Sequence, residues 1–262
     1  MNPMDTIVRR PARYLIGGLL SLSAQLTCAA QPDGASAAHQ NFSGVWQVET
    51  PVFAVRTEKG EEPPLQPAAA KVYHDRIAAR KQGDTSFDPA TWCASVGMPR
   101  LMFINYPFEI MVGPKHVALM HEWHWWARVV YLPGGLTPTV RKTQANVNIG
   151  GLQPVLNIMT PGAVGVSRGE WVDDKLVVKT DLLNDSTPID SAGLPHSDSL
   201  KLTETLRLRS PDVLEDHIRF DDPTTFTRPW ETVVTYRRKP GARIHEDVCL
   251  DRLQAGEPAV KE

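Results

Sequence analysis

The chain has 262 residues, of which 42% are hydrophobic and 22% charged, and its formal net charge is −2. This near-neutral, slightly acidic balance gives no reason to expect nucleic acid or an anionic membrane surface as a partner. Beyond the N-terminus, no segment approaches the roughly 20 apolar residues that a membrane-spanning helix needs.

The N-terminal residues have the order of a secretory signal peptide. Three arginines within residues 9–13 precede an apolar run over residues 14–26, and small residues follow up to Ala30. Positive charge, apolar core and small residues in this order predict export and cleavage near Ala30, so that residues 1–30 are removed. A lipid-attachment signal at Cys28 is the nearest alternative. We therefore expect a periplasmic or secreted protein with 25 basic and 29 acidic side chains.

Two cysteines remain after removal of the signal peptide, Cys93 and Cys249. In an oxidising compartment one disulfide between them is the simplest state. It would close a loop of more than 150 residues, for which the chain-entropy model gives about 5 kcal/mol before strain is subtracted. Two free thiols, one of them catalytic, are the weaker alternative because neither cysteine lies in a nucleophile motif.

The mature chain is predicted to contain one domain. We expect a disordered leader over residues 31–41, a single β-barrel domain over residues 42–255 and a flexible tail over residues 256–262. One helix is predicted from Gln66 to Gln82, after two prolines, either on the surface or as a plug over one end of a barrel.

Six segments from residue 107 onward have the composition of strands. They are rich in β-branched and aromatic residues, and clusters of Pro, Gly, Asp and Asn separate them. The segments are FEIMV, VALMHEWHWWARVVY, KLVVKT, LKLTETLRLR, VLEDHIRF and ETVVTYRR. Several strands with one or two short helices predict a mainly β fold, either a closed antiparallel barrel or a curved sandwich. Residues 184–198 form a loop too long for a hairpin, and long loops in compact domains are often functional.

The segment MHEWHWWARVVY, residues 120–131, concentrates the chemically active side chains of the chain. As one strand, it would alternate its side chains between two faces. The even-numbered face would carry Glu122, His124, Trp126 and Arg128. His121 and His124 would then lie on opposite faces, which argues against a shared metal ion, and we expect no metal site. The even-numbered face lines a pocket in one interpretation and faces solvent in the other.

A second strand contains a carboxylate on an apolar face. Glu204 is the single charge among the leucines of LKLTETLRLR, and an isolated buried charge is too costly for a fold to carry. Two explanations stay open: an ion pair with an inward arginine such as Arg128, or an acid–base group whose pKa burial has raised. His196 lies just before this strand, and an imidazole is well suited to move protons near neutral pH. A loop histidine that caps local backbone is the equally open alternative.

In these features the chain resembles a family of exported bacterial proteins with a lipocalin-like or small β-barrel fold. The resemblance covers roughly residues 42–249. It depends on Gly44-Val-Trp46, residues 93–100, Glu122 with Arg128 and Tyr131, Gly169-Glu-Trp171, residues 193–197, Glu204, Asp222-Pro223, Pro229-Trp230 and Cys249. The turn after Trp171 and Lys179 depart from the family pattern, so no role is carried over there. The resemblance implies a barrel with a pocket, and agrees with the pairing of Cys93 and Cys249.

These observations predict a site within the barrel. The expected catalytic residues are His196, Glu204, Glu122 and Arg128. The expected substrate-binding residues are His124, Trp126, Tyr131, Trp171 and Trp230.

The leading hypothesis for function is a cofactor-free periplasmic lyase, dehydratase or isomerase. It would act by general acid–base chemistry on a small hydrophobic or aromatic molecule that bears a hydroxyl or carbonyl group. His196 would be the general acid or base, Glu204 or Glu122 its partner, and Arg128 the cation that stabilises an enolate or phenolate. The alternative is a non-catalytic, lipocalin-like carrier of a lipophilic ligand. A third possibility is a structural or envelope interaction protein.

Overall fold

The structure is a computed structural model, and it describes residues 37–135, 139–140, 158–159 and 162–260. The predicted signal peptide and residues 31–36 of the predicted leader lie outside this part of the chain. The described residues belong to one compact unit.

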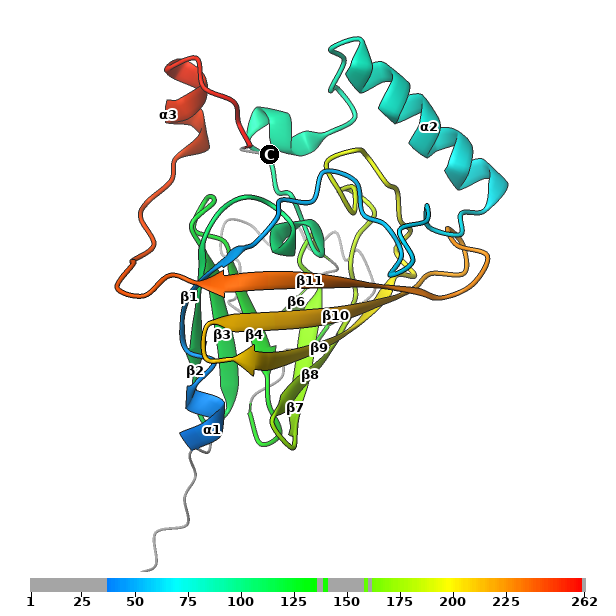
Figure 1. The fold of residues 1–262 in the computed structure, drawn as a ribbon. Coiled ribbons are helices and arrows are strands. Elements are labelled where there is room, and N and C mark those ends of the chain that lie inside the picture. The colour runs from blue at the N-terminus through cyan, green and yellow to red at the C-terminus, as the bar shows by residue number, and fades with distance from the viewer. Residues whose placement is uncertain (1–36, 136–138, 141–157, 160–161, 261–262) are drawn as a thin grey trace, which may run out of the picture. The chain divides into compact units, whose positions relative to one another are not determined.

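Nine of the described strands close into a barrel, which confirms the mainly β fold and decides against the curved sandwich (Figure 1). The strands are β1 (Gly44–Val48), β2 (Phe108–Val112), β3 (His116–His121), β4 (Ala127–Tyr131), β7 (Val166–Val172), β8 (Lys175–Asp181), β9 (Lys201–Ser210), β10 (Val213–Asp221) and β11 (Trp230–Arg238). Around the barrel they follow the order β1-β11-β10-β9-β8-β7-β4-β3-β2. Neighbours pair antiparallel except β4 and β7, which run parallel. Two short strands, β5 (Thr139–Val140) and β6 (Ile158–Met159), form a separate parallel pair.

The barrel strands alternate between apolar and polar residues. In β9 the leucines at 202 and 206 are buried while the residues between them are more exposed, apart from Glu204. One face of each strand thus enters a common core, and the other face meets solvent. Large aromatic side chains fill the interior, among them Trp46, Phe108 and Phe220.

Helices occupy the two ends of the barrel. They are α1 (Ala37–Gln40), α2 (Pro67–Lys81) and α3 (Cys249–Gln254), with 3-10 turns η1 (Pro89–Trp92) and η2 (Arg100–Met102). The predicted helix agrees with α2 to within one residue at each end, and Pro67 suits the first helical position because that position needs no N–H donor. Helices α2 and α3 lie at one end of the barrel and α1 at the other (Figure 1). No helix in the described part of the chain is both long and apolar enough to cross a membrane.

Parts of the predicted leader and of the predicted tail make contacts with the barrel domain. Helix α1 lies within the predicted leader, and the ring of its His39 stacks on Trp171 with centroids 3.9 Å apart. In the predicted flexible tail, Ala259 and Val260 are buried. The carbonyl of Ala259 accepts a hydrogen bond from Nε1 of buried Trp123 at 3.1 Å. Contacts with the barrel domain therefore extend to both segments.

The prediction of a single strand over residues 117–131 is wrong. Strand β3 ends at His121 and β4 begins at Ala127, and the turn between them holds His124 and Trp125 at φ values of 55° and 53°. The register pairs Leu119 with Arg128, so odd-numbered residues of β3 share a face with even-numbered residues of β4. A hairpin thereby places His121 and Arg128 together in the interior, whereas one strand would separate them.

A buried ion network fixes the covering segments over the barrel. Asp88, fully buried, accepts hydrogen bonds from Arg100 at 2.6 and 2.9 Å and from Arg80 at 2.8 Å. Arg100 also donates to Ser191 in the long loop over residues 184–198, which has no helix or strand, as predicted. This network joins α2, the 3-10 turns and the loop into one cap.

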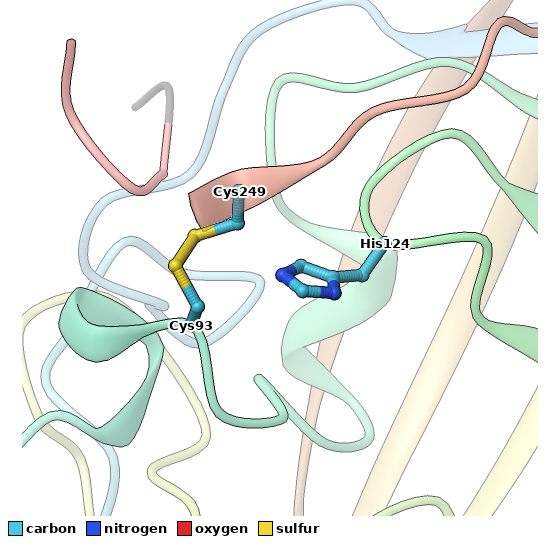
Figure 2. A group of neighbouring side chains, drawn as sticks. All are labelled: Cys93, His124 and Cys249. Atoms are coloured by element: carbon cyan, nitrogen blue, oxygen red, sulfur yellow. A yellow bond between two sulfur atoms is a disulfide. The ribbon is translucent and has the colours of Figure 1, made fainter. Parts of the chain in front are cut away.

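The predicted disulfide is present, between Cys93 and Cys249, with their Cα atoms 5.7 Å apart (Figure 2). Cys93 follows η1 and Cys249 begins α3, and the two lie 156 residues apart in the chain. The bond therefore attaches the C-terminal helix to the cap.

Candidate functional site

Polar side chains from seven neighbouring strands meet inside the barrel. We call this group the interior polar cluster, and its members are His121, Arg128, Ser167, Thr180, Glu204, Asp216 and Tyr236. They come from β3, β4, β7, β8, β9, β10 and β11 respectively. All are buried, with exposed fractions of 2% or less. Such a group in an otherwise apolar core needs a structural or functional reason.

An ion pair between Arg128 and Glu204 forms the centre of the cluster. Nη1 of Arg128 donates to Oε1 of Glu204 at 2.8 Å, and Nη2 donates to the other carboxylate oxygen. The remaining donors reach Ser167 and Thr180, each at 2.9 Å. Burial lowers the pKa of Arg128, but the charge and hydrogen bonds of Glu204 outweigh it and raise that pKa above its ordinary value. Of the two explanations for Glu204, the structure therefore shows the ion pair with Arg128.

Asp216 is a second buried carboxyl group beside this pair. Burial, followed by the negative charge of Glu204, raises the pKa of Asp216 well above its ordinary value. No N–H or O–H donor among the described residues reaches either of its oxygens, and its hydrogen-bond neighbour is the carboxyl group of Glu204. As an ionised group Asp216 would have no donor to accept from, whereas a neutral carboxyl can donate its proton to Glu204. Of the two carboxyl groups, Asp216 is therefore the one that more readily holds a proton.

His121 is a buried imidazole that stays neutral. Burial, followed by the positive charge of Arg128, lowers the pKa of His121 to about 3. Its ring stacks on Phe108 with centroids 5.2 Å apart, and both ring nitrogens are buried without a partner among the described residues. One nitrogen of a neutral imidazole is an acceptor, so His121 offers a free base in the interior.

Tyr236 connects the cluster to the cap. Its hydroxyl donates to the backbone carbonyl of Met102 in η2 at 3.1 Å, and its ring meets Phe108 edge to face. Burial, followed by the neighbouring carboxyl groups of Asp216 and Glu204, raises the pKa of Tyr236 well above its ordinary value. The cluster thus contains a neutral acid, a neutral base and a phenol around one fixed cation.

The predicted catalytic residues do not form one group. His196 is buried in the loop before β9, where its Nδ1 lies 2.9 Å from the carbonyl oxygen of Ser197. Burial lowers the pKa of His196, and the Ser197 carbonyl and the charge of Asp222 oppose this shift. No contact within the described residues joins His196 to Glu204 or Arg128. Asp222 holds this loop in place by accepting from the backbone N and the hydroxyl of Ser197, each at 2.7 Å.

Glu122 and His124 lie in the β3–β4 turn and not in the barrel interior. A carboxylate oxygen of Glu122 accepts from the backbone N of His245 at 3.0 Å, which attaches the C-terminal segment. His124 faces the disulfide (Figure 2). The predicted row containing Glu122, His124 and Arg128 is therefore not one face, because the turn ends the strand alternation after His121.

The other predicted substrate-binding residues are separated as well. Trp126 packs on the edge of the core, and Trp171 packs on α1. Tyr131 lines a surface hollow of about 290 Å³ beside Arg168. Trp230 stacks on Phe220 at 4.0 Å and lines a different hollow, with Glu58 and Arg228 among its neighbours. These residues do not share one pocket.

Five members of the interior polar cluster were not among the predicted site residues: Ser167, Thr180, Asp216 and Tyr236, and also His121, which was considered only as a metal ligand. The signal for Asp216 is of the same kind as the signal for Glu204. In VLEDHIRF it shares a face with Leu214, Ile218 and Phe220, all buried. For His121 the signal is the alternation of VALMH, where Val117 and Leu119 precede it on the buried face.

The titration of His121 makes stability depend on pH in a defined direction. An unfolded histidine binds a proton below about pH 6.5, whereas folded His121 does so only near pH 3. Between these values the unfolded state binds the extra proton, so the free energy of unfolding falls by about 1.4 kcal/mol per pH unit as pH falls. Asp216 acts in the opposite direction, because its raised pKa destabilises the fold as pH rises above about 4.

Comparison of the wild type with His121→Phe isolates the histidine contribution. Between pH 7 and pH 4.5 the free energy of unfolding should fall by about 2–3 kcal/mol more in the wild type than in the variant. Urea unfolding at the two pH values measures this difference. Equal losses in both proteins would show that His121 takes up its proton in the folded state.

Comparisons with known proteins add no family to this description. No family model matches the chain, and neither curated proteins nor solved structures give a match. The closed barrel agrees with a small β-barrel fold, while membership of an exported lipocalin-like family stays a prediction.

Proposed function

We propose that the barrel interior transfers protons on a small molecule, with Asp216 as proton donor, His121 as proton acceptor and Arg128 as stabilising cation. One observation carries the proposal: both ring nitrogens of His121 are buried without partners in the described structure, and the oxygens of Asp216 meet no donor there. Leaving a buried polar group unpaired costs about 1–3 kcal/mol. A guest with its own donor and acceptor would recover that energy.

The protonation states of the two groups suit acid–base catalysis. A neutral carboxyl group can give a proton and a neutral imidazole can take one. Because the pKa of His121 is about 3 in the empty barrel, the negative charge that develops on a bound guest has to raise that pKa for the transfer to occur. Oppositely perturbed titratable groups in one interior are a common feature of catalytic sites. In this proposal Glu204 is a positioning residue, because its carboxylate is engaged with Arg128.

The apolar neighbours of the interior polar cluster suggest the class of substrate. Leu202, Leu206 and Phe220 are buried around the cluster, which favours an apolar or aromatic body with one hydroxyl or carbonyl group. His121 would take the proton from carbon beside a carbonyl, the resulting enolate would face Arg128, and Asp216 would return a proton to another atom. The proton removed by His121 balances the one supplied by Asp216, which describes an isomerisation. Loss of a hydroxyl as water after the same first step describes a dehydration.

Entry of a guest requires the cap to move. The atoms of His121 and Asp216 are closed to solvent, and η2 covers the cluster through the contact between Tyr236 and Met102. Closure of a cap over the reacting groups also excludes water from them.

Deuterium exchange tests proton transfer even where the product of the reaction is unidentified. The protein is incubated in D₂O with a panel of small aromatic and alicyclic ketones and hydroxy ketones, and mass spectrometry measures deuterium incorporation into each compound. Wild type should accelerate exchange of at least one class, and Asp216→Asn and His121→Phe should each lower that rate by about 10²-fold or more. His116→Gln changes an exposed histidine on the same strand and should exchange at the wild-type rate. Folded variants, as judged by near-UV circular dichroism, that keep the wild-type rate would overturn the proposal.

The carrier function is the second candidate, and the bidentate engagement of Glu204 with Arg128 favours it. A carrier would bind members of the same panel, with quenching of tryptophan fluorescence, but would not accelerate deuterium exchange. Binding without exchange therefore selects the carrier, and neither binding nor exchange excludes both functions for these compounds.

A further inference from the structure

The disulfide has an imidazole for a neighbour. Ligand atoms of Cys93, Cys249 and His124 all lie within 4.8 Å of one another, and Figure 2 shows a ring nitrogen of His124 directed at the two sulfur atoms. The three residues come from distant parts of the chain: the end of η1, the first residue of α3 and the β3–β4 turn. Tertiary structure therefore assembles two sulfurs and one imidazole nitrogen at one point.

We propose that the reduced chain binds a thiophilic divalent cation of the zinc class through Cys93, Cys249 and His124, and that disulfide formation expels this cation. The proposal is independent of the function proposed for the barrel interior, because none of the three residues belongs to the interior polar cluster. Two cysteines and one histidine with an open fourth position are a ligand set that zinc takes in proteins.

The spacing suits a tetrahedral ion after a small rearrangement. Zinc binds sulfur at about 2.3 Å and nitrogen at about 2.0–2.1 Å, so its ligand atoms lie about 3.5–3.8 Å apart. The existing span of 4.8 Å is close to that separation. Reduction has only to let the sulfurs move from bonding distance to about 3.8 Å. With the Cα atoms 5.7 Å apart, rotation of the cysteine side chains supplies that change.

The described contacts give the Nε2 atom of His124 no structural role. Its Nε2 is buried and lacks a hydrogen-bond partner among the described residues. An apolar side chain would pack against a disulfide as well as an imidazole does, so packing alone does not explain a histidine here. A buried nitrogen with a free lone pair beside two sulfurs is what a metal ligand requires.

The local backbone is held in conformations that non-glycine residues seldom adopt. Cys93 has φ 66° and His124 has φ 55°. Residues of this kind persist only where the surroundings hold them, and they are frequent at ligand sites. Here the backbone N of His124 donates to Asp247 at 3.4 Å, and Asp247 is also paired with Arg252. The same pairing offsets the positive charge of Arg252 near the sulfurs.

The exchange between the two states is balanced in atoms and charge. A phosphine or dithiol reductant supplies two electrons, and with two protons the disulfide becomes two thiols. Binding of the divalent cation then releases both thiol protons, because the thiolate is the ligand. Oxidation of the two thiolates to the disulfide removes two electrons and frees the cation.

Cobalt titration tests the site directly, because tetrahedral Co²⁺ bound by thiolate has visible d–d bands and a near-ultraviolet charge-transfer band. Full-length mature protein, reduced with a phosphine and kept free of oxygen, should bind one Co²⁺ per chain with both bands, and air oxidation should abolish them. Cys93→Ser should lose the charge-transfer intensity of one thiolate. His124→Ala should lower the affinity at least tenfold and change the d–d bands. His116→Ala, at an exposed histidine of β3, should behave as wild type.

Two results of the cobalt titration would overturn the proposal. The first is reduced wild type that shows no such bands. The second is His124→Ala with the affinity and spectrum of wild type. Zinc provides a second test if reduction loosens the fold. Saturating Zn²⁺ should raise the urea midpoint of the reduced wild type, and it should raise the midpoint of reduced His124→Ala by less. An unchanged midpoint in the reduced wild type would likewise exclude the site.

Discussion

Replacement of Arg128 by methionine should lower the free energy of unfolding by about 3–5 kcal/mol, because it leaves Glu204 buried without its counter-ion. Arg128 donates to both oxygens of the Glu204 carboxylate and has hydrogen bonds to Ser167 and Thr180. The methionine has a similar length but none of these donors. Urea unfolding at pH 7, followed by circular dichroism, measures the loss.

The double variant Arg128→Met/Glu204→Leu distinguishes the net contribution of the ion pair from the cost of leaving one charge buried without a partner. With both charges removed, most of the stability should return, because apolar residues of similar size replace a buried ion pair at little cost. Arg168→Met is the matched control: Arg168 pairs with Asp181 on the surface, and its loss should change stability by about 1 kcal/mol or less. A small effect of Arg128→Met would mean that Glu204 readily takes up a proton, and would make it an acid–base candidate again.

Removal of the disulfide should produce the second large loss. Cys93 and Cys249 close a loop of 156 residues, for which the chain-entropy model gives about 5 kcal/mol, and losses of about 2–5 kcal/mol are usual for native disulfides. The physical reason is that the unfolded chain gains the conformations that the crosslink forbids. Urea unfolding of Cys93→Ser/Cys249→Ser against oxidised wild type measures the difference.

The disulfide experiment needs a metal chelator throughout, so that ion binding by the reduced chain does not restore stability. Reduced wild type in chelator should then unfold at the same midpoint as the double serine variant. If reduced wild type and the double serine variant both unfold at the urea midpoint of oxidised wild type, the crosslink does not constrain the unfolded chain as the chain-entropy model requires.

Much of the architecture was predictable because strand alternation and turn residues are local properties. The segments KLVVKT, LKLTETLRLR and VLEDHIRF form β8, β9 and β10 close to their predicted limits. The hairpin between β3 and β4 was not predicted, because the six residues around the turn are as aromatic as a strand and contain no glycine or proline. Positive φ values at His124 and Trp125 close that turn, and non-glycine residues give no sequence signal for them.

The burial of Glu204 was predictable for the same reason, since a single carboxylate among alternating leucines has only one face to occupy. The ion-pair partner of Glu204 could not be decided from the sequence, because pairing with Arg128 depends on β4, β7, β8 and β9 being neighbours in the barrel. Asp216 was within reach of the same argument applied to β10. The separation of His196 and Glu122 from the cluster depends on how two loops fold, which no periodic pattern describes.

The sequence by itself indicated the class of fold, the approximate limits of β2 and of β8 to β11, and the helix α2, because hydrophobic periodicity and turn chemistry act over a few residues. It favoured the disulfide for another reason, since only two cysteines remain after the predicted signal peptide. Only the tertiary structure decided which polar groups meet. Closing the sheet brings seven strands around one interior, and the resulting burial and neighbouring charges set the protonation of His121 and Asp216. Burial and neighbouring charge both arise from contacts between residues far apart in the chain. The alternation within a single strand therefore contains no information about them.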